Sequence, residues 1–281
     1  ASSSSLTDAE WSMLAPLLPQ NYRRSSEHDP VIGQSGSLLM APLQLKHGCN
    51  WEALPKDLPP YSTVYWHYKQ WRSAGVIEQL MRILHAQVRE QVQKKPQWTT
   101  LTIIDSQAVK HTCNASVDSK GFCFYKATHG LKRHLAVETL GSFFTHGTKA
   151  NVSDDAGLLE LLTLNIDYFK AKPVDLPKTT ILLDHGDHID VLIETLEQVY
   201  PQIMTKSRFE RSTKPSKQEK AAQGKAGFVP AVARWVIERS NAWMERCKSL
   251  VKNFERTLAH ATTKLNLCFV RLMLKRLAAA S

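Results

Sequence analysis

The sequence lacks the features that mark several large classes of protein. No segment approaches the roughly 20 consecutive apolar residues of a membrane-spanning helix. The opening Ala1-Ser2-Ser3-Ser4-Ser5 has none of the basic, apolar and cleavage regions of a secretory signal. The five cysteines are odd in number and form no Cys-x-x-Cys pair, which argues against a disulfide framework and a zinc site. We therefore expect reduced thiols, a cytoplasmic location and no membrane partner.

The chain does have ample length and an uneven distribution of charge. Its 281 residues, 43% of them hydrophobic, suffice for one large core or two smaller ones. Residues 201–281 hold 17 Lys and Arg against 5 Asp and Glu, whereas residues 99–200 hold 9 against 13. A basic last third suits a polyanion such as DNA. Aromatic side chains interleave with these basic residues, which favours nucleic acid over a merely soluble surface.

Residues 1–96 are predicted to form an all-helical N-terminal domain. Apolar residues recur there at helical spacing between polar or proline-containing turns. The expected helices start at a capping Thr7 or Asp8, cover about 38–47, follow a capping Ser62, and run from about 75 to 93. Two short helices around a turn could enter a DNA groove, or could simply pack as a helical domain. The sequence alone does not favour either interpretation.

The periodicity changes after residue 96, so residues 97–281 are predicted to form a second domain. Short β-rich segments there alternate with helical patterns. The expected strands are 101–110, 131–139, 141–150 and 179–184, with 201–209 as a further candidate. The expected helices start at Ser153 and cover 189–200, 231–256 and 258–278, and 211–228 is predicted to be a flexible loop. This order describes an α/β fold, a mixed sheet flanked by helices.

Three acidic residues occupy positions that suit phosphoryl-transfer chemistry. Asp105 and Asp184 each follow an apolar strand segment, and Glu238 lies in an otherwise basic and aromatic helix. Functional groups of open α/β sheets gather at the carboxyl ends of strands. Two Mg²⁺ ions roughly 3.5–4 Å apart can activate an attacking oxygen and stabilise a leaving one, and Mg²⁺ prefers hard oxygen ligands. We therefore expect Asp105 to bridge two metals and Asp184 and Glu238 to complete the coordination.

Each acid also has a plain structural interpretation. Asp105 could end a strand, Asp184 could belong to a loop that caps the next helix, and Glu238 could pair with a neighbouring arginine. Glu245 shares the helix face of Glu238 and is a second candidate ligand. A rival hydrolase site would use the local cluster from His185 to His188, whose ligands suit Zn, Mn or Fe.

Several basic residues are candidate contacts for DNA phosphates, with a solvated surface as the alternative. They are Lys110, Lys132, Arg133, Arg234, Arg239, Arg246 and Lys248.

Together these segments resemble bacterial insertion-sequence transposases of the DDE type, in the IS-five-like group. The resemblance covers nearly the whole chain. It is carried by Leu6–Trp11, Gly48–Pro55, Pro60–Tyr65, Ile103–Lys110 and Gly130–Val137. The most specific match is Arg234-Trp235-Val236-Ile237-Glu238-Arg239 with Trp243, which resembles the glutamate-bearing helix of that group.

The resemblance implies an RNase H-like catalytic domain that uses Mg²⁺, with Mn²⁺ as a possible substitute. It implies cleavage of insertion-sequence ends and their joining to double-stranded target DNA, by a homodimer in the synaptic complex in the bacterial cytoplasm at the nucleoid. By position, Asp105, Asp184 and Glu238 would be the catalytic triad. The alternative is a relative that binds DNA without the chemistry.

Two positions depart from the pattern of the group. Asp187 stands where an aromatic residue is common, which places an extra negative charge near the expected metals. Glu245 stands where a basic or amide residue is common.

Overall fold

The structure, a computed structural model, describes residues 6–18, 43–56, 59–92, 98–184, 188–211 and 234–279. The chain divides into two compact units. One comprises residues 1–97, 110–118 and 243–281, and the other comprises 98–109 and 119–242. The predicted boundary near residue 96 stays a prediction, and residues 243–281 group with the N-terminal helices, not with the sheet. No helix in the described ranges has both the length and the apolar character needed to cross a bilayer.

The first unit is helical. Its helices include α1 (Asp8–Leu14), α3 (Tyr61–Ser73), α4 (Val76–Gln91), α11 (Lys248–Val251) and α12 (Leu258–Ala278). The expected cap of α1 is confirmed, because the Thr7 hydroxyl accepts from the Glu10 amide at 3.2 Å while Glu10 Oε2 accepts from the Thr7 amide at 2.8 Å. The expected Ser62 cap is wrong. Helix α3 begins at Tyr61 with Pro60 at its N-cap and no side-chain cap.

The long helix expected over 231–256 is interrupted. Helix α10 (Arg234–Glu245) ends before Cys247, whose φ of −100° and ψ of 105° are extended, and α11 begins at Lys248. The apolar spacing continues through this break, which is why the sequence predicted a single helix. The last helix, α12, has the expected bounds.

The second unit is built on a mixed sheet. Its strands are β1 (Leu101–Lys110), β2 (Gly121–Cys123), β3 (Thr128–Glu138), β4 (Gly141–Lys149), β5 (Thr179–Leu183) and β6 (Ser207–Arg211). The order is β2-β3-β1-β5-β6, and β4 also pairs with β3. The β2–β3 and β3–β4 pairs are antiparallel, whereas β1–β5 and β5–β6 are parallel. The strand expected over 201–209 is displaced, because α8 (Ile203–Lys206) precedes β6.

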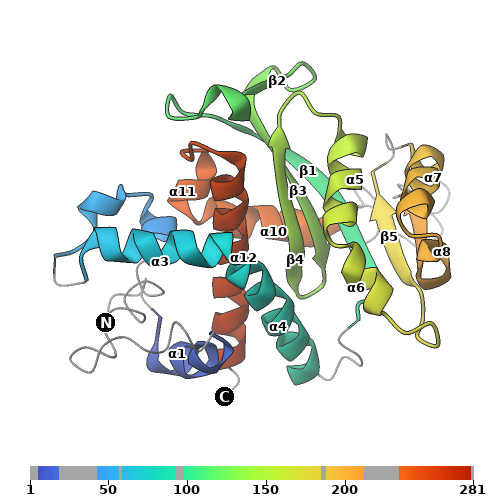
Figure 1. Cartoon of the computed structure of the whole chain (residues 1–281), viewed down its shortest axis with the longest axis horizontal. Helices are drawn as coiled ribbons and strands as arrows, with labels where there is room; N and C mark the ends of the chain where they lie inside the picture. The colour runs from blue at the N-terminus through green and yellow to red at the C-terminus, as the bar shows by residue number, and fades with distance from the viewer. Residues whose placement is uncertain are drawn as a thin grey trace, which may run out of the picture. The chain divides into compact units, whose positions relative to one another are not determined.

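Helices cover both faces of this sheet. On one face α5 (Asp154–Leu164), α6 (Ile166–Ala171) and α7 (Ile189–Val199) bury a core that includes Ile104, Ile181 and Leu183. Figure 1 draws α5 in front of the strands and α10 behind them. As expected, Ser153 caps α5 by accepting a hydrogen bond from the amide of Ala156 at 3.2 Å.

Candidate active site

Asp105 and Asp184 occupy matching positions on two adjacent parallel strands. Ile103 of β1 is the register partner of Leu182 of β5, and each aspartate follows two residues later. Neighbouring strands are about 4.8 Å apart, so the pairing brings these two side chains together. Asp184 directly follows β5 and so lies at the carboxyl end of its strand, as expected. The same expectation is wrong for Asp105, because β1 continues to Lys110 and Asp105 lies in the middle of it.

Successive side chains of β1 point to opposite faces of the sheet. Ile104 belongs to the core beneath α5 and α7, so Asp105 points to the opposite face. By the same register, Asp184 shares the face of Asp105. Figure 1 draws α10, the helix that carries Glu238, on the side of the strands away from α5.

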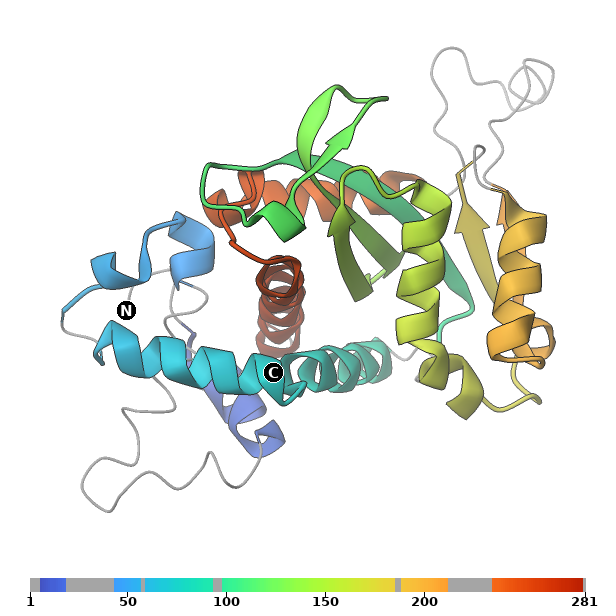
Figure 2. The ribbon, with the colours of Figure 1, turned by 45° about the horizontal axis from the view of Figure 1, so that its top comes forward.

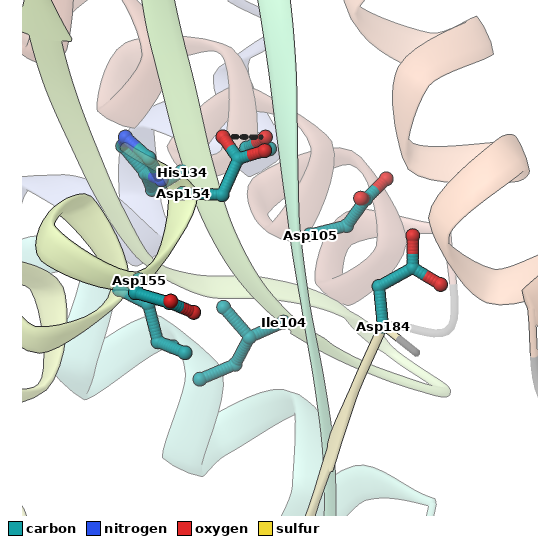
Figure 3. Close-up of a pocket in the computed structure, with 8 residues that line it drawn as sticks. Ile104, Asp105, His134, Asp154, Asp155 and Asp184 are labelled. Atoms are coloured by element: carbon teal, nitrogen blue, oxygen red, sulfur yellow. Dashed lines mark hydrogen bonds between the residues drawn. The ribbon is translucent and has the colours of Figure 1, made fainter. Parts of the chain in front are cut away.

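The two aspartates line a pocket of about 240 Å³ within the second unit. Figure 3 shows the carboxylates of Asp105 and Asp184 on one side of β1, with His134, Asp154 and Asp155 on the other. The lining comprises Ile104, Asp105, Ser106, His134, Asp154, Asp155, Leu158 and Asp184. Four carboxylates therefore line the pocket, but only Asp105 and Asp184 share one side of β1.

Asp154, in the first turn of α5, is held in place by two donors. Ser106 Oγ donates to Asp154 Oδ1 at 2.7 Å, and Lys132 Nζ lies 2.9 Å from the same oxygen. Partial burial by itself would raise the pKa of Asp154, but the hydrogen bonds from Ser106 and Lys132 and the Lys132 charge outweigh it and lower the pKa. Asp154 is thereby stabilised as a carboxylate.

Lys132 has an internal role that differs from the expected DNA contact. It is 8% exposed, and besides its ion pair with Asp154 it donates to the Val152 carbonyl at 2.7 Å. Arg133 is 4% exposed. Neither side chain is presented on the surface of the structure, so the assignment of both to DNA phosphates needs correction.

His134 lines the same pocket from β3 and was not singled out by sequence reasoning. Burial, followed by the electrostatic effect of neighbouring His146, lowers the pKa of His134 to about 4 despite the opposing effect of Asp154. Its Nε2 lies 2.9 Å from Thr148 Oγ1. A Cβ on Gly157 of α5 would come within 2.1 Å of the His134 ring, so the glycine is what lets this ring pack against the helix.

Asp155 connects the start of α5 to the start of α7. Its carboxylate accepts from the His188 amide at 3.2 Å and lies 2.6 Å from His188 Nδ1. Of the rival hydrolase cluster, His185 and Asp187 lie outside the described residues. His188, its remaining histidine, is paired with Asp155.

The third expected ligand, Glu238, has an exposed side chain. It lies on an exposed face of α10 with Trp235 and Glu245, while Val236 and Ile237 are buried at 0% and 4% exposure. The pocket lining given above does not include Glu238. The structure therefore brings together the two expected aspartates, and Glu238 remains at the surface of the helix.

The other expected basic contacts differ in environment. Arg239 donates to the Thr139 carbonyl at 2.7 Å, and its guanidinium lies 4.7 Å from the centre of the Trp235 ring. The side chain of Arg234 is outside what the structure describes. Of the basic residues expected to contact DNA, Lys110, Arg246 and Lys248 have exposed side chains.

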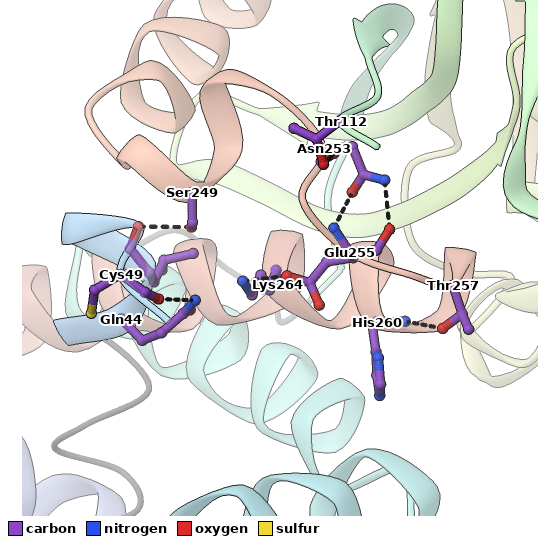
Figure 4. A network of polar contacts seen from close by, with 10 residues as sticks. Gln44, Cys49, Thr112, Ser249, Asn253, Glu255, Thr257, His260 and Lys264 are labelled. Carbon is purple, nitrogen blue, oxygen red and sulfur yellow. Dashed lines mark hydrogen bonds and ion pairs between the residues drawn. The ribbon is translucent and has the colours of Figure 1, made fainter. Parts of the chain in front are cut away.

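The first unit contains a larger hollow of about 1000 Å³, lined by both acidic and basic side chains. Figure 4 shows the polar contacts beside it. Lys264 forms an ion pair with Glu255, and Ser249 Oγ donates to the Leu45 carbonyl at 2.7 Å. Asn253 Nδ2 donates to the Glu255 carbonyl at 3.1 Å. These groups satisfy one another, which indicates a structural network.

The donor set of the smaller pocket suits a hard divalent cation. Its carboxylate oxygens are the ligand type that Mg²⁺ prefers, and Mg²⁺ keeps several waters, so few protein ligands are required. Across the described ranges, no group of three or more His, Cys, Asp or Glu residues is arranged to hold a metal. Asp105 and Asp184 thus fit as a partial site that needs a further ligand.

Comparison with protein families shows the family to which the chain belongs. Residues 96–274 match the family described as transposase DDE domain. The chain is a DDE transposase. Residues 6–81 match a second family, described as putative transposase of IS4/5 family. No curated protein and no solved structure matches the chain.

Family membership accounts for the fold of the second unit and implies DNA as a partner. The catalytic domain of a DDE transposase has an RNase H-like fold, and the mixed sheet with helices on both faces is that fold. Transposases of this type act on DNA and generally use divalent metal ions. The helical segment ahead of the sheet falls within the second family match.

Proposed function

We propose that this transposase cleaves the ends of an insertion sequence and joins them to target DNA by metal-dependent phosphoryl transfer. The observation that carries the proposal is the register of β1 and β5, which places the carboxylates of Asp105 and Asp184 side by side on one face of the sheet. Glu238 is proposed as the third ligand, since α10 lies on the side of the sheet away from α5. Asp105 would contribute to both metals, and Asp184 and Glu238 to one each.

The chemistry requires two displacements at phosphorus. In the first, a water oxygen attacks the phosphate at the element's end, the bond to the 3′ oxygen breaks, and a 3′-hydroxyl is released. In the second, that hydroxyl attacks a target phosphate and displaces another 3′ oxygen. A bound pair of Mg²⁺ ions supplies activation of the attacking oxygen and stabilisation of the leaving one. The protein residues hold the ions and orient the phosphate.

Asp154 and its partners are proposed to position this site. Ser106 follows Asp105 directly and points to the opposite face, where it donates to Asp154 at 2.7 Å. The bond fixes the middle of β1 against the start of α5. Exposed Lys110, Arg246 and Lys248 are proposed to contact DNA phosphates. Two DNA ends must be brought together, so a homodimer is proposed for the synaptic complex in the bacterial cytoplasm.

The test compares two glutamates on one exposed face of α10. Glu238→Gln removes the proposed ligand charge, whereas Glu245→Gln changes a matched acid seven residues later. With DNA carrying the element's own ends and Mg²⁺, we expect Glu238→Gln to slow cleavage by at least about a hundredfold, or ~2.7 kcal/mol in activation free energy. Glu245→Gln should cleave like the parent. Equal cleavage by parent and Glu238→Gln would refute the assignment.

A second candidate function is DNA binding without cleavage. The observation that favours it is the position of Glu238 outside the pocket lining, together with the acidic Asp187 and Glu245 where the family commonly has other residues. Calorimetric titration with Mg²⁺, with and without end DNA, separates the two functions. An inactive relative would bind the ends yet show no metal-dependent nicking.

A further inference from the structure

The most exposed aromatic side chains of the described chain lie at the turn of the β2–β3 hairpin. Phe124 is 86% exposed and Tyr125 is 99% exposed. We call these two adjacent residues the aromatic tip. Phe122 packs edge-on against Phe124 with ring centres 4.9 Å apart. Large contiguous apolar surface on a protein marks an interaction site more often than isolated residues do.

The backbone of this hairpin is well defined by hydrogen bonds. The Ala127 amide donates to the Phe124 carbonyl at 3.3 Å, and the Thr128 hydroxyl donates to the Lys126 carbonyl at 2.7 Å. Ala127 has a φ of 43°, in the left-handed region. A non-glycine residue in that region needs support from its surroundings. The turn is thus held in a shape that points two rings into solvent.

The base of the hairpin is fixed next to the candidate active site. A Cβ on Gly121 would lie 2.6 Å from the Ala150 amide nitrogen and from Asn151 Oδ1. The Ala150 amide also donates to the Gly130 carbonyl at 3.2 Å. The connection that begins at Ala150 leads directly into α5, whose first turn lines the pocket. Figure 2 shows the hairpin projecting from the end of the sheet.

The charge around the tip fits a polyanion. Residues 119–130 contain Lys120 and Lys126 and no acidic residue, and both lysines are exposed. A surface that combines protruding rings with positive charge suits DNA with accessible bases, because rings stack on bases while lysines meet phosphates. A second copy of this chain would not require the positive charge.

We propose that the aromatic tip stacks on unpaired bases of DNA beside the cleavage site. This inference rests on the proposed function, because it takes DNA to run through the pocket and past the base of the hairpin. Phe124 and Tyr125 act as positioning residues that hold separated strands. Exposed rings inserted between or against bases are a general means of holding distorted DNA.

The experiment compares the full chain on two DNA probes without divalent ions, so that no cleavage occurs. One probe is a blunt duplex, and the other is the same duplex with a short unpaired fork carrying 2-aminopurine. Anisotropy gives both affinities, and quenching reports stacking. We expect the parent to prefer the fork by about tenfold, since stacking contributes ~1–3 kcal/mol per base. Phe124→Ala/Tyr125→Ala should lose the preference and the quenching but keep its affinity for the blunt duplex.

Three further variants test whether the preference for the fork depends on aromatic rings. Phe124→Tyr/Tyr125→Phe should retain the preference, because both rings remain. Phe124→Leu/Tyr125→Leu should lose it, and retention by this variant would overturn stacking. Val174→Ala, which alters an apolar residue of the same unit that is 67% exposed, should behave like the parent.

The remaining outcomes separate this inference from the proposed function. Equal binding of fork and duplex by the parent would overturn the proposed stacking by the aromatic tip and would leave the proposed DNA cleavage and joining unaffected. Failure of the parent to bind either probe overturns both. Light scattering on the parent and on Phe124→Ala/Tyr125→Ala tests the alternative partner of the aromatic tip, a second copy of this chain. A dimer that becomes a monomer without a change in DNA preference would assign the tip to contact between copies.

Discussion

A neutral histidine is enclosed among charged groups at the pocket. His134 is 1% exposed, and its burial disfavours the protonated form more than Asp154 favours it. In the unfolded chain the same histidine would titrate near 6.5. The folded protein therefore binds fewer protons at this residue than the unfolded chain does over the interval between the two pKa values.

This difference predicts an acid-dependent loss of stability. As the pH falls from about 6.5 to about 4, His134 becomes protonated in the unfolded state but stays neutral in the folded state. The free energy of unfolding should therefore fall by up to ~3 kcal/mol. Denaturant unfolding of the parent at pH 7 and pH 5 measures the loss. His134→Gln, which cannot titrate, should show a smaller drop, and exposed His129→Gln should match the parent. An unchanged drop in His134→Gln would contradict the prediction.

The lowered pKa of Asp154 acts in a different interval. Its folded pKa is below the ordinary value, so its contribution to stability is present above that value and is lost as the pH falls through the folded pKa. The two effects are separable, because the histidine interval ends near pH 4. Unfolding curves between pH 7 and 5 therefore report on histidines and not on Asp154. Burial also lowers the pKa of His67, so the comparison with His134→Gln isolates the contribution of His134.

At the scale of the elements, helix α5 packs closely against strand β3 at a glycine, which has no side chain. Gly157 lets the His134 ring occupy space that a Cβ would enter at 2.1 Å. In an isolated helix, alanine would be favoured over glycine by ~1 kcal/mol. The packing constraint opposes that propensity and should outweigh it.

We therefore expect Gly157→Ala to destabilise the protein by ~1–3 kcal/mol, the usual cost of overpacking. Thermal or denaturant unfolding measures the change. Combining Gly157→Ala with His134→Ala removes the clash, so the double variant should lose less stability than the sum of the single variants. Additive losses would show that the two residues do not collide.

Local patterns predicted much of the fold. Strand β1 and helix α12 have the expected bounds, because each shows an uninterrupted pattern between polar or proline-containing turns. Strand β2 has only three residues, too few for a period. The break at Cys247 lies within continuous helical spacing, so only the backbone reveals it.

Only those features of the site that depend on the local sequence of one strand could be predicted. Adjacent residues place Asp105 and Asp184 each after an apolar strand segment, and their face follows from alternation, although β1 continues past Asp105 to Lys110. The contacts of Asp154 with Ser106 and Lys132 depend on how α5 packs against β1 and β3. Such pairings join residues far apart in the sequence, and nothing in a single sequence displays them. The surface position of Glu238 likewise depends on how α10 is rotated.

At the scale of the molecule, helices from both parts of the chain build the first unit. Helix α12 packs against α4 and α1. Its Leu265 and Leu274 are 0% and 1% exposed. The Gln91 side chain at the end of α4 donates to the Leu277 carbonyl at 3.2 Å. The stability of the N-terminal helices should therefore depend on α12.

Leu265→Ala tests this dependence. Loss of a fully buried leucine should lower the free energy of unfolding by ~2–5 kcal/mol. Amide hydrogen exchange should accelerate in α4, although α4 itself is unchanged. Leu272→Ala, a partly exposed leucine of the same helix, should have a smaller effect on both. Unchanged exchange in α4 would show that the two helices are stabilised independently.

The packing of α12 against α1 and α4 also sets an order of events during translation. The early helices leave the ribosome long before α12 exists, so their apolar faces remain uncovered while the whole sheet unit is synthesised. The sheet unit, by contrast, has its strands available well before the last codons are read. A message that stops early would yield a polypeptide with unpartnered helices, which cellular proteases and chaperones would recognise.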